Sequence, residues 1–385
     1  MSLIRARYVA SSFLAALGLV GALAVPAAAQ TDAPAPAAAA PTTPTPTGFL
    51  ANIQLGGLLD GYYNYNSNDP TGDMPFRNFD TKNKEARFSM GELWAAKAPS
   101  SDSRIGFNLH VGAGHAFEMI NAAEPSTASA LQHIEQAYVS YLAPVGKGLQ
   151  IDAGKFVTQH GAEVIEAKDN WNYSRSLLFA LAIPYYHAGV RASYTVNDKV
   201  AFMGTVVNGW NDVKDNNGGK TVGGQVTVKP TKALTIVQNY MVGPEQAHDT
   251  ADVRQLFDTI ATVTATSKVS VMANYDYGRD AVAGSGVDWQ GIAGYLKVQA
   301  TPWLAIVPRV EVFNDPNGFM TGTSQLMKDT TLTGEFKLPG GVLWRVEYRR
   351  DMSDAAVFAK PTGAMVQSQN TFGMGVLYSY QFTTR

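Results

Sequence analysis

Apolar and polar side chains alternate with a period of two along most of the chain, from Ile53 to Phe382. Strict alternation predicts β-strands, because successive side chains on a strand point to opposite faces. Each alternating segment is about ten residues long, which exceeds the five or six that are usual for strands. The pattern therefore predicts an all-β protein with long strands. It is clearest at 105–113, 186–196, 269–277 and 372–382.

The connections between these segments alternate between short and long. Seven are turn-like: 99–103, 144–148, 197–199, 230–232, 266–268, 301–302 and 339–341. Eight are long: 67–82, 116–130, 160–183, 212–219, 244–252, 279–287, 314–325 and 352–368. These fifteen connections join sixteen strands, and their regular alternation places every long loop at one end. This order predicts an up-and-down antiparallel meander.

Strand length and loop asymmetry favour a transmembrane barrel over a soluble β-sandwich or propeller. About ten tilted residues cross the hydrocarbon of a bilayer, and closure pairs every backbone donor and acceptor without water. We therefore expect a transmembrane antiparallel up-and-down β-barrel of about 16 strands over residues 48–385. Aromatic residues near the predicted strand ends support this fold as an interfacial girdle: Trp94, Tyr275, Tyr277, Trp289, Trp303, Trp344, Tyr348, Tyr378, Tyr380 and Phe382.

A barrel of about sixteen strands encloses a lumen wide enough for water, whereas about eight strands are filled by their own side chains. Polar residues on the inner face would then line a passage, or pair with one another across strands. The residues expected on this face are Arg104, Asn108, His110, Arg309, Glu311, Arg345, Glu347 and Arg349.

The third long loop, 160–183, is also the longest, and it mixes apolar and charged residues. We expect it to fold inward and narrow the lumen, because its apolar residues can pack against the wall and its charges can select ions. The alternative is a loop that covers the barrel mouth with solvated charges. The expected constriction comprises Glu163, Glu166, Asp169 and Arg175 in the loop, with Lys155, His187 and Arg191 on the flanking strands.

The first 47 residues have a different composition from the rest. Two arginines precede an apolar run from Val9 to Val25, and three alanines end at Ala29. This three-part pattern predicts a secretory signal peptide over residues 1–29, and a membrane anchor is the alternative. Residues 30–47 are rich in Pro, Ala and Thr, which predicts an extended periplasmic tether.

Composition excludes several kinds of chemistry. The 385 residues include no cysteine, so disulfides, thiolate metal sites and cysteine nucleophiles are ruled out. The charged fraction of 16% is low, and a net charge of −2 offers no basic face for nucleic acid. Gly219-Lys220-Thr221 lacks the spacing of a phosphate-binding loop. His160 and Glu163 could share a surface ion, but we expect no cofactor, no metal and no enzyme.

Four blocks within about 50 residues resemble the OmpL-like β-barrel porin-2 family of Gram-negative outer membranes: 161–166, 169–179, 184–191 and 208–211. The resemblance implies an outer-membrane porin that passes small hydrophilic solutes, without catalysis or cofactor. One feature departs from outer-membrane barrels, which commonly end on an aromatic residue read by the insertion machinery. Here Phe382 is followed by Thr383-Thr384-Arg385.

We therefore expect a water-filled channel for passive diffusion, located in the outer membrane after export. Its expected partners are outer-membrane lipid, small hydrophilic solutes or ions, and the barrel insertion machinery, with monomer and homo-oligomer both left open. Two alternatives remain at this stage. One is a non-conducting barrel that acts as an adhesin or anchors the envelope. The other is a barrel enzyme that hydrolyses lipids or esters.

Overall fold

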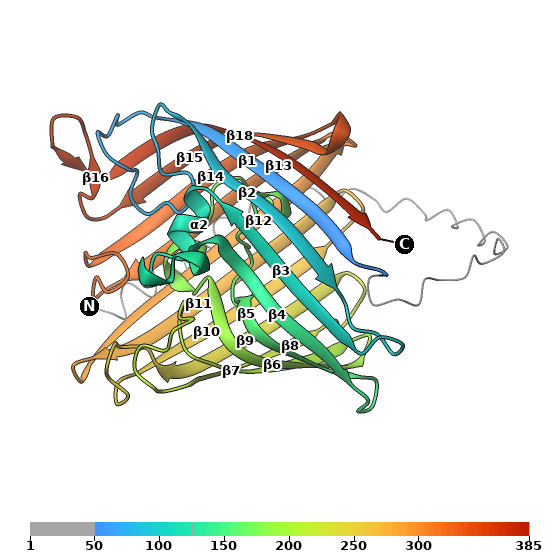
Figure 1. The fold of residues 1–385 in the computed structure, drawn as a ribbon. Helices are drawn as coiled ribbons and strands as arrows, with labels where there is room; N and C mark the ends of the chain where they lie inside the picture. The colour runs from blue at the N-terminus through green and yellow to red at the C-terminus, as the bar shows by residue number, and fades with distance from the viewer. Residues whose placement is uncertain (1–50, 125, 385) are drawn as a thin grey trace. The chain divides into compact units, whose positions relative to one another are not determined.

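The computed structural model describes residues 51–124 and 126–384, and the part from Ile53 to Thr383 forms a closed antiparallel β-barrel (Figure 1). Sixteen strands make up the barrel. They are β1 (Gln54–Asn66), β2 (Ala86–Lys97), β3 (Ile105–Ala113), β4 (Ile134–Ala143), β5 (Leu149–Val157), β6 (Tyr186–Asn197), β7 (Val200–Val207), β8 (Thr221–Val228), β9 (Leu234–Pro244), β10 (Val253–Thr264), β11 (Val269–Val282), β12 (Ser285–Thr301), β13 (Leu304–Asp315), β14 (Gln325–Leu338), β15 (Val342–Ser353) and β18 (Ser368–Thr383).

Small elements occupy four of the connections. These are α2 (His115–Ile120), η2 (Ser126–His133), η3 (Ala167–Asp169), η4 (Leu178–Ala182), η5 (Pro339–Gly341) and the hairpin of β16 (Phe358–Ala359) with β17 (Met365–Val366). None of the helices among the described residues is long and apolar enough to span a membrane.

The barrel closes by pairing its first strand with its last. β1 and β18 run antiparallel in continuous register from Gln54–Thr383 to Asn66–Thr371. All other strands that are adjacent in the barrel are also consecutive in sequence, except for β15 and β18, which are separated in the chain by the small β16–β17 hairpin. Within residues 53–383 the barrel therefore has no free strand edge, and its backbone hydrogen bonds need no water. The predicted fold class and strand number are confirmed.

The alternating pattern separates an outer apolar face from an inner polar face. On β18, Phe372, Met374, Val376, Tyr378, Tyr380 and Phe382 are each 41–54% exposed, and all lie on the outer face. Inner positions of the same strand, such as Gln369 and Thr371, are buried. An apolar face turned outward and a polar face turned inward are the arrangement that a transmembrane barrel requires.

Long connections and short turns lie at opposite ends of the barrel, with the long ones at the left in Figure 1. One predicted loop is wrong. Residues 279–287 were expected to form a long loop, but β11 and β12 continue to a two-residue turn at Ala283-Gly284. Both residues have positive φ, 51° and 76°, as a type I′ hairpin turn demands. Of the polar residues before the turn, Asp280 is buried on the inner face, where polarity does not end a strand, and Arg279 is exposed on the outer face.

Two members of the predicted aromatic girdle are also misplaced. Trp94 stacks on His110, and Trp289 is completely buried and pairs in register with Gly278. Both therefore lie on the inner face. Other members face outward as expected, including Trp303, Tyr277, Tyr378, Tyr380 and Phe382. The predicted signal peptide and tether, residues 1–29 and 30–47, lie outside the described residues.

Candidate functional site

The connection between β5 and β6, residues 158–185, folds into the barrel. Its apolar stretch is fully covered, with Leu177, Leu178 and Phe179 at most 3% exposed. These side chains belong to one buried cluster with Trp289 of β12 and Phe313 of β13. An apolar segment gains by leaving water, and the inner faces of β12 and β13 offer it aromatic and small side chains. We call residues 158–185 the inward loop.

Buried arginines on the opposite wall hold the backbone of the inward loop. Arg309 of β13 donates through Nη1 to the Ser174 carbonyl at 2.6 Å, and Arg349 of β15 donates to the Arg175 carbonyl at 2.6 Å. Arg345 donates to the carbonyls of residues 167, 170 and 172. Charged donors make stronger hydrogen bonds than neutral ones, so these contacts fix the path of the loop.

Carboxylates on the wall accept hydrogen bonds from the amides of the same loop. Glu347 accepts from Tyr173 N at 2.9 Å, and Glu311 accepts from Leu177 N at 2.7 Å. Asp258 on β10 accepts from Gly161 N at 2.9 Å. The loop is therefore attached to strands on one broad side of the barrel, from β10 to β15.

The inward loop also reaches the seam between β1 and β18. Tyr173 donates its hydroxyl to Asp60 of β1 at 2.8 Å. Its ring lies where a side chain at Gly375 of β18 would be, because a Cβ there would stand 2.2 Å from the ring. The loop thus crosses the interior from β5 and β6 to the far wall.

This arrangement distinguishes two expectations about the lumen. Arg309, Glu311, Arg345 and Arg349 were expected to line a passage or to pair across strands, and they are 0–3% exposed beneath the inward loop. They pair with wall carboxylates as well as with the loop, as in Arg345 with Glu335 at 2.6 Å and Arg349 with Asp329 at 2.7 Å. Their role in this fold is to bind the loop.

Of the four expected constriction residues in the loop, Glu163 and Arg175 have side chains that are buried within the loop itself. Glu163 accepts from Ser176 N at 2.6 Å and pairs with Arg309 at 3.1 Å. Arg175 donates to the carbonyls of Tyr173 and Val164, at 2.6 and 3.1 Å. Both side chains are about 5% exposed, so they brace the loop from within.

The three flanking-strand residues are not brought together with the loop charges. Lys155 donates to Asn121 Oδ1 and to the Ile134 carbonyl. His187 contacts Thr158 Oγ1 and the Gly209 carbonyl through its two ring nitrogens. Arg191 pairs with Asp152 at 2.8 Å and lies over the rings of Tyr138 and Phe156.

The remaining two, Glu166 and Asp169, face a cavity of about 380 Å³. This cavity separates the inward loop from the wall of β1–β5 and extends to Pro99 in a short turn. Its charged lining combines carboxylates with cationic groups, and Asp169 pairs with Lys168 at 2.5 Å. The charged and polar lining residues include Glu92, Lys97, Asn108, His110, Gln150, Glu166, Lys168 and Asp169. We call this space the lumen cavity.

Burial shifts the ionisation of several groups on the inward loop. It raises the pKa of Glu166, and the charge of Glu92 adds to that effect. It lowers the pKa of His160 to about 3, so this imidazole is neutral at pH 7. It raises the pKa of the Tyr185 hydroxyl to about 12. The shifts share one cause, because an ion under the loop would lose part of its hydration.

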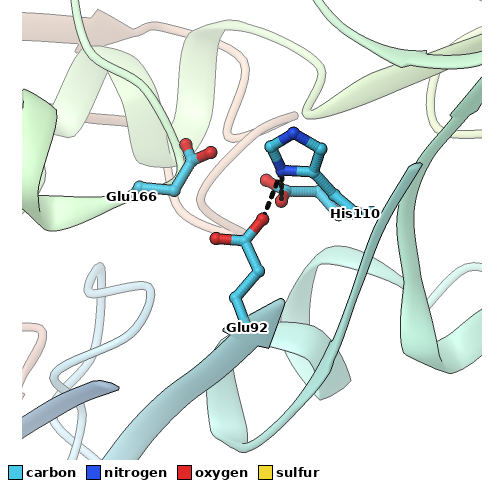
Figure 2. A group of neighbouring side chains, drawn as sticks. Glu92, His110 and Glu166 are labelled. Carbon is cyan, nitrogen blue, oxygen red and sulfur yellow. Dashed lines mark hydrogen bonds and ion pairs between the residues drawn. The ribbon is translucent and has the colours of Figure 1, made fainter. Parts of the chain in front are cut away.

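Four side chains converge where the inward loop meets β2–β4. One ligand-type atom from each of Glu92, His110, Glu135 and Glu166 lies within 4.8 Å of all the others. Figure 2 shows Glu92, His110 and Glu166 pointing toward one another from two strands and the loop. Sequence reasoning placed His110 on the inner face and Glu166 in the loop but did not connect them. Glu92 and Glu135 were missed.

A local signal for Glu135 was present in the sequence. Glu135 and Gln136 are consecutive polar residues at the start of an alternating strand. In the structure, His110 pairs with Gln136 and Val111 pairs with Ile134, so Glu135 is the extra residue of a β-bulge. Bulges redirect side chains, and this one turns Glu135 inward, where it is completely buried.

Comparisons with known proteins agree with this architecture. A family model described as "Putative beta-barrel porin-2, OmpL-like" matches residues 52–380. Among solved structures, the outer-membrane expressed OmpT of Vibrio cholerae has a TM-score of 0.58 at 12% identity, covering 86% of this chain and 99% of that one. The outer-membrane channel DcaP of Acinetobacter baumannii scores 0.57 at 12% identity, covering 86% and 97%.

A third solved structure is similar to the same extent. The anion-selective porin from Comamonas acidovorans has a TM-score of 0.57 at 10% identity, covering 86% of this chain and all of that one. Identities this low show the fold alone. Among curated proteins, no match to the chain was found.

Proposed function

The chain belongs to the "Putative beta-barrel porin-2, OmpL-like" family, and from this premise we propose that it forms a water-filled channel for passive diffusion of small hydrophilic solutes across the outer membrane. The observation that carries the proposal is the closed barrel of sixteen strands, with its apolar face turned outward and its polar face inward. Lipid is the medium that such an outer face fits.

The narrowest section of this channel lies between the inward loop and the wall of β1–β5. Glu166 and Asp169 contribute from the loop, whereas Arg191 of β6 pairs with Asp152 and is not part of the lining of this cavity. Glu163 and Arg175 hold the loop in shape, while Lys155 and His187 fix the strands on either side of it. Charged groups at a narrow point are how wide pores select ions.

Single-channel recording in planar bilayers tests the channel directly. The purified barrel should conduct, and flux in liposomes should fall with increasing size of neutral sugars. A folded barrel without conductance would contradict the proposal and would favour an adhesin or an envelope anchor. Folding is checked separately by the different gel migration of unboiled and boiled protein.

The ion selectivity of the channel tests whether Glu166 and Asp169 form the constriction. Replacing Glu166→Gln and Asp169→Asn together should lower the cation-to-anion permeability ratio by about a factor of two, because two negative charges leave the narrowest section. EDTA on both sides keeps stray metal ions out of the measurement. Glu118→Gln is the control, since that carboxylate is exposed on α2. An unchanged ratio in the double variant would remove Glu166 and Asp169 from the constriction.

The export of the protein, its lack of catalysis and its oligomeric state can each be tested separately. We infer export by a signal peptide over residues 1–29, with residues 30–47 as a periplasmic tether, and N-terminal sequencing of the mature protein should begin at Gln30. We infer no catalysis, which an assay of lipid and ester hydrolysis would check. One OmpT structure is described as a trimer form, and native mass spectrometry in detergent would determine whether this barrel also assembles.

A further inference from the structure

We propose that Glu92, His110, Glu135 and Glu166 form a binding site for one divalent transition-metal ion at the edge of the lumen cavity (Figure 2). Glu92 comes from β2, His110 from β3, Glu135 from the bulge in β4 and Glu166 from the inward loop. The site joins three neighbouring strands to the loop that crosses the interior.

The spacing of the ligand atoms suits a metal ion. One atom from each residue lies within 4.8 Å of the others. Carboxylate oxygens and imidazole nitrogens bind Zn²⁺ at about 2.0–2.2 Å, and tetrahedral coordination places such ligands about 3.4 Å apart. Side-chain movements of about 1 Å or less would bring all four into range.

Glu135 provides a second, independent observation. Its carboxylate is completely buried, and neither oxygen has a hydrogen-bond partner among the described residues. His110 Nδ1 lies 3.7 Å from Glu135 Oε2, within ion-pair range but beyond a hydrogen bond. Glu92 Oε2 is also buried without a hydrogen bond. A buried carboxylate without hydrogen bonds is costly, and a cation among these oxygens would remove that cost.

Lys168 and Lys155 do not fill this role. Lys168 pairs with Asp169 at 2.5 Å and lies 5.5 Å from the centre of the Trp94 ring. Lys155 is bound to Asn121 and to the Ile134 carbonyl. Three carboxylates therefore converge on a single imidazole, and a dication would balance most of their charge.

The ligand types indicate the class of metal. Three carboxylates alone would suit Mg²⁺ or Ca²⁺, whereas an imidazole favours first-row transition ions. The mixed set therefore points to Mn²⁺, Fe²⁺ or Zn²⁺ rather than Mg²⁺. A metal ion can reach the site from the lumen cavity, because Glu92, His110 and Glu166 line that cavity. An ion here would also tie Glu166 of the inward loop to the wall of β2–β4, on the side where the arginines do not reach.

Metal binding to the refolded, EDTA-treated full barrel in detergent tests the proposal, and the measurement is independent of conductance. Isothermal titration with Zn²⁺ and electron paramagnetic resonance with Mn²⁺ should each show one site. Glu135→Gln and His110→Gln should each lower the affinity by at least about tenfold. A large excess of Mg²⁺ should not displace the bound ion.

The matched control is Asp169→Asn, which removes a carboxylate from the same cavity but not from the group of four. Its metal affinity should stay within about threefold of the unsubstituted barrel, since it loses only a nearby charge. Gel migration of unboiled samples verifies that each variant is folded. The proposal is overturned if the unsubstituted barrel binds no ion, if Glu135→Gln and His110→Gln bind as tightly as it does, or if Mg²⁺ displaces the ion at equal concentration.

Discussion

Arg345 links the inward loop to the barrel wall through a single guanidinium. It donates to the carbonyls of residues 167, 170 and 172, and it pairs with Glu335 at 2.6 Å. All of these groups are buried, so removing the arginine leaves Lys297 as the remaining charge partner of Glu335 and takes the charged donor away from all three carbonyls. Breaking a buried ion pair from one side is among the costliest single substitutions.

We expect Arg345→Met to lower the free energy of unfolding by about 3–5 kcal/mol. Urea titrations of the refolded barrel, followed by tryptophan fluorescence, measure this change. Arg350→Met is the control on the same strand, because Arg350 is exposed and bonds only Asn370 at 3.1 Å among the described side chains. The control should change by less than about 1 kcal/mol. Equal effects of the two substitutions would show that the buried contact does not hold the loop.

Asp212 makes the loop 208–220 sensitive to pH. Burial raises the pKa of this carboxyl from 3.8 to about 7, and the charges of Glu245, Glu124 and Asp215 add to the shift. Because the folded pKa is the higher one, the folded loop keeps a proton that the unfolded loop releases above about pH 4. The stabilisation of the folded loop by this proton on Asp212 is complete at acid pH and is lost as the pH rises through 7.

Amide exchange in 208–220 should therefore be several-fold faster at pH 8 than at pH 5.5, after correction for the intrinsic rates. Asp212→Asn should abolish the difference and leave exchange slow at both values. A pH step that persists in the variant would mean that another group causes it.

At the scale of elements, the turn at Ala283-Gly284 is the tightest connection at the long-loop end. Ala283 has φ of 51°, a conformation that alanine adopts at a cost and asparagine adopts readily. We expect Ala283→Asn to stabilise the barrel by up to about 1 kcal/mol, and Ala283→Val to destabilise it by a similar amount. Urea midpoints of the three proteins provide the measurement. A midpoint that fell with asparagine would contradict the type I′ assignment.

The strands could be predicted from the sequence, but the contacts between the strands and the inward loop could not. Alternation is a local property, so it identified the strands, their order and the outward side of β18. It could not reveal that Arg345 would bind carbonyls more than 170 residues earlier, because no local pattern encodes that contact. The inward loop was predicted from its apolar residues, but its attachment to the far wall was not. Glu135 stayed hidden because a bulge changes the side of the sheet to which a residue belongs.

At the scale of the whole molecule, the outer face should behave as a lipid-facing band. Val376 lies near the middle of β18 and is exposed outward. A lysine at the bilayer midplane costs about 2–4 kcal/mol in transmembrane barrels. We expect Val376→Lys to show a loss of that size when the barrel is refolded into lipid vesicles and titrated with urea.

Val145→Lys is the control, because Val145 is exposed in the short turn between β4 and β5, outside the membrane-spanning strands. It should leave the free energy of unfolding nearly unchanged. If both lysines were tolerated equally, the middle of β18 would not lie in hydrocarbon.

The attachment of the inward loop has a consequence for the order of assembly. The groups that hold the loop lie mainly on β10–β15, and Arg345 follows Asn172 by 173 residues. When the loop is synthesised, the strands that will receive it do not yet exist. Its apolar stretch lacks its packing partners on β12 and β13 until the last third of the chain has been made. The inward loop can therefore reach its final position only after these late strands are present.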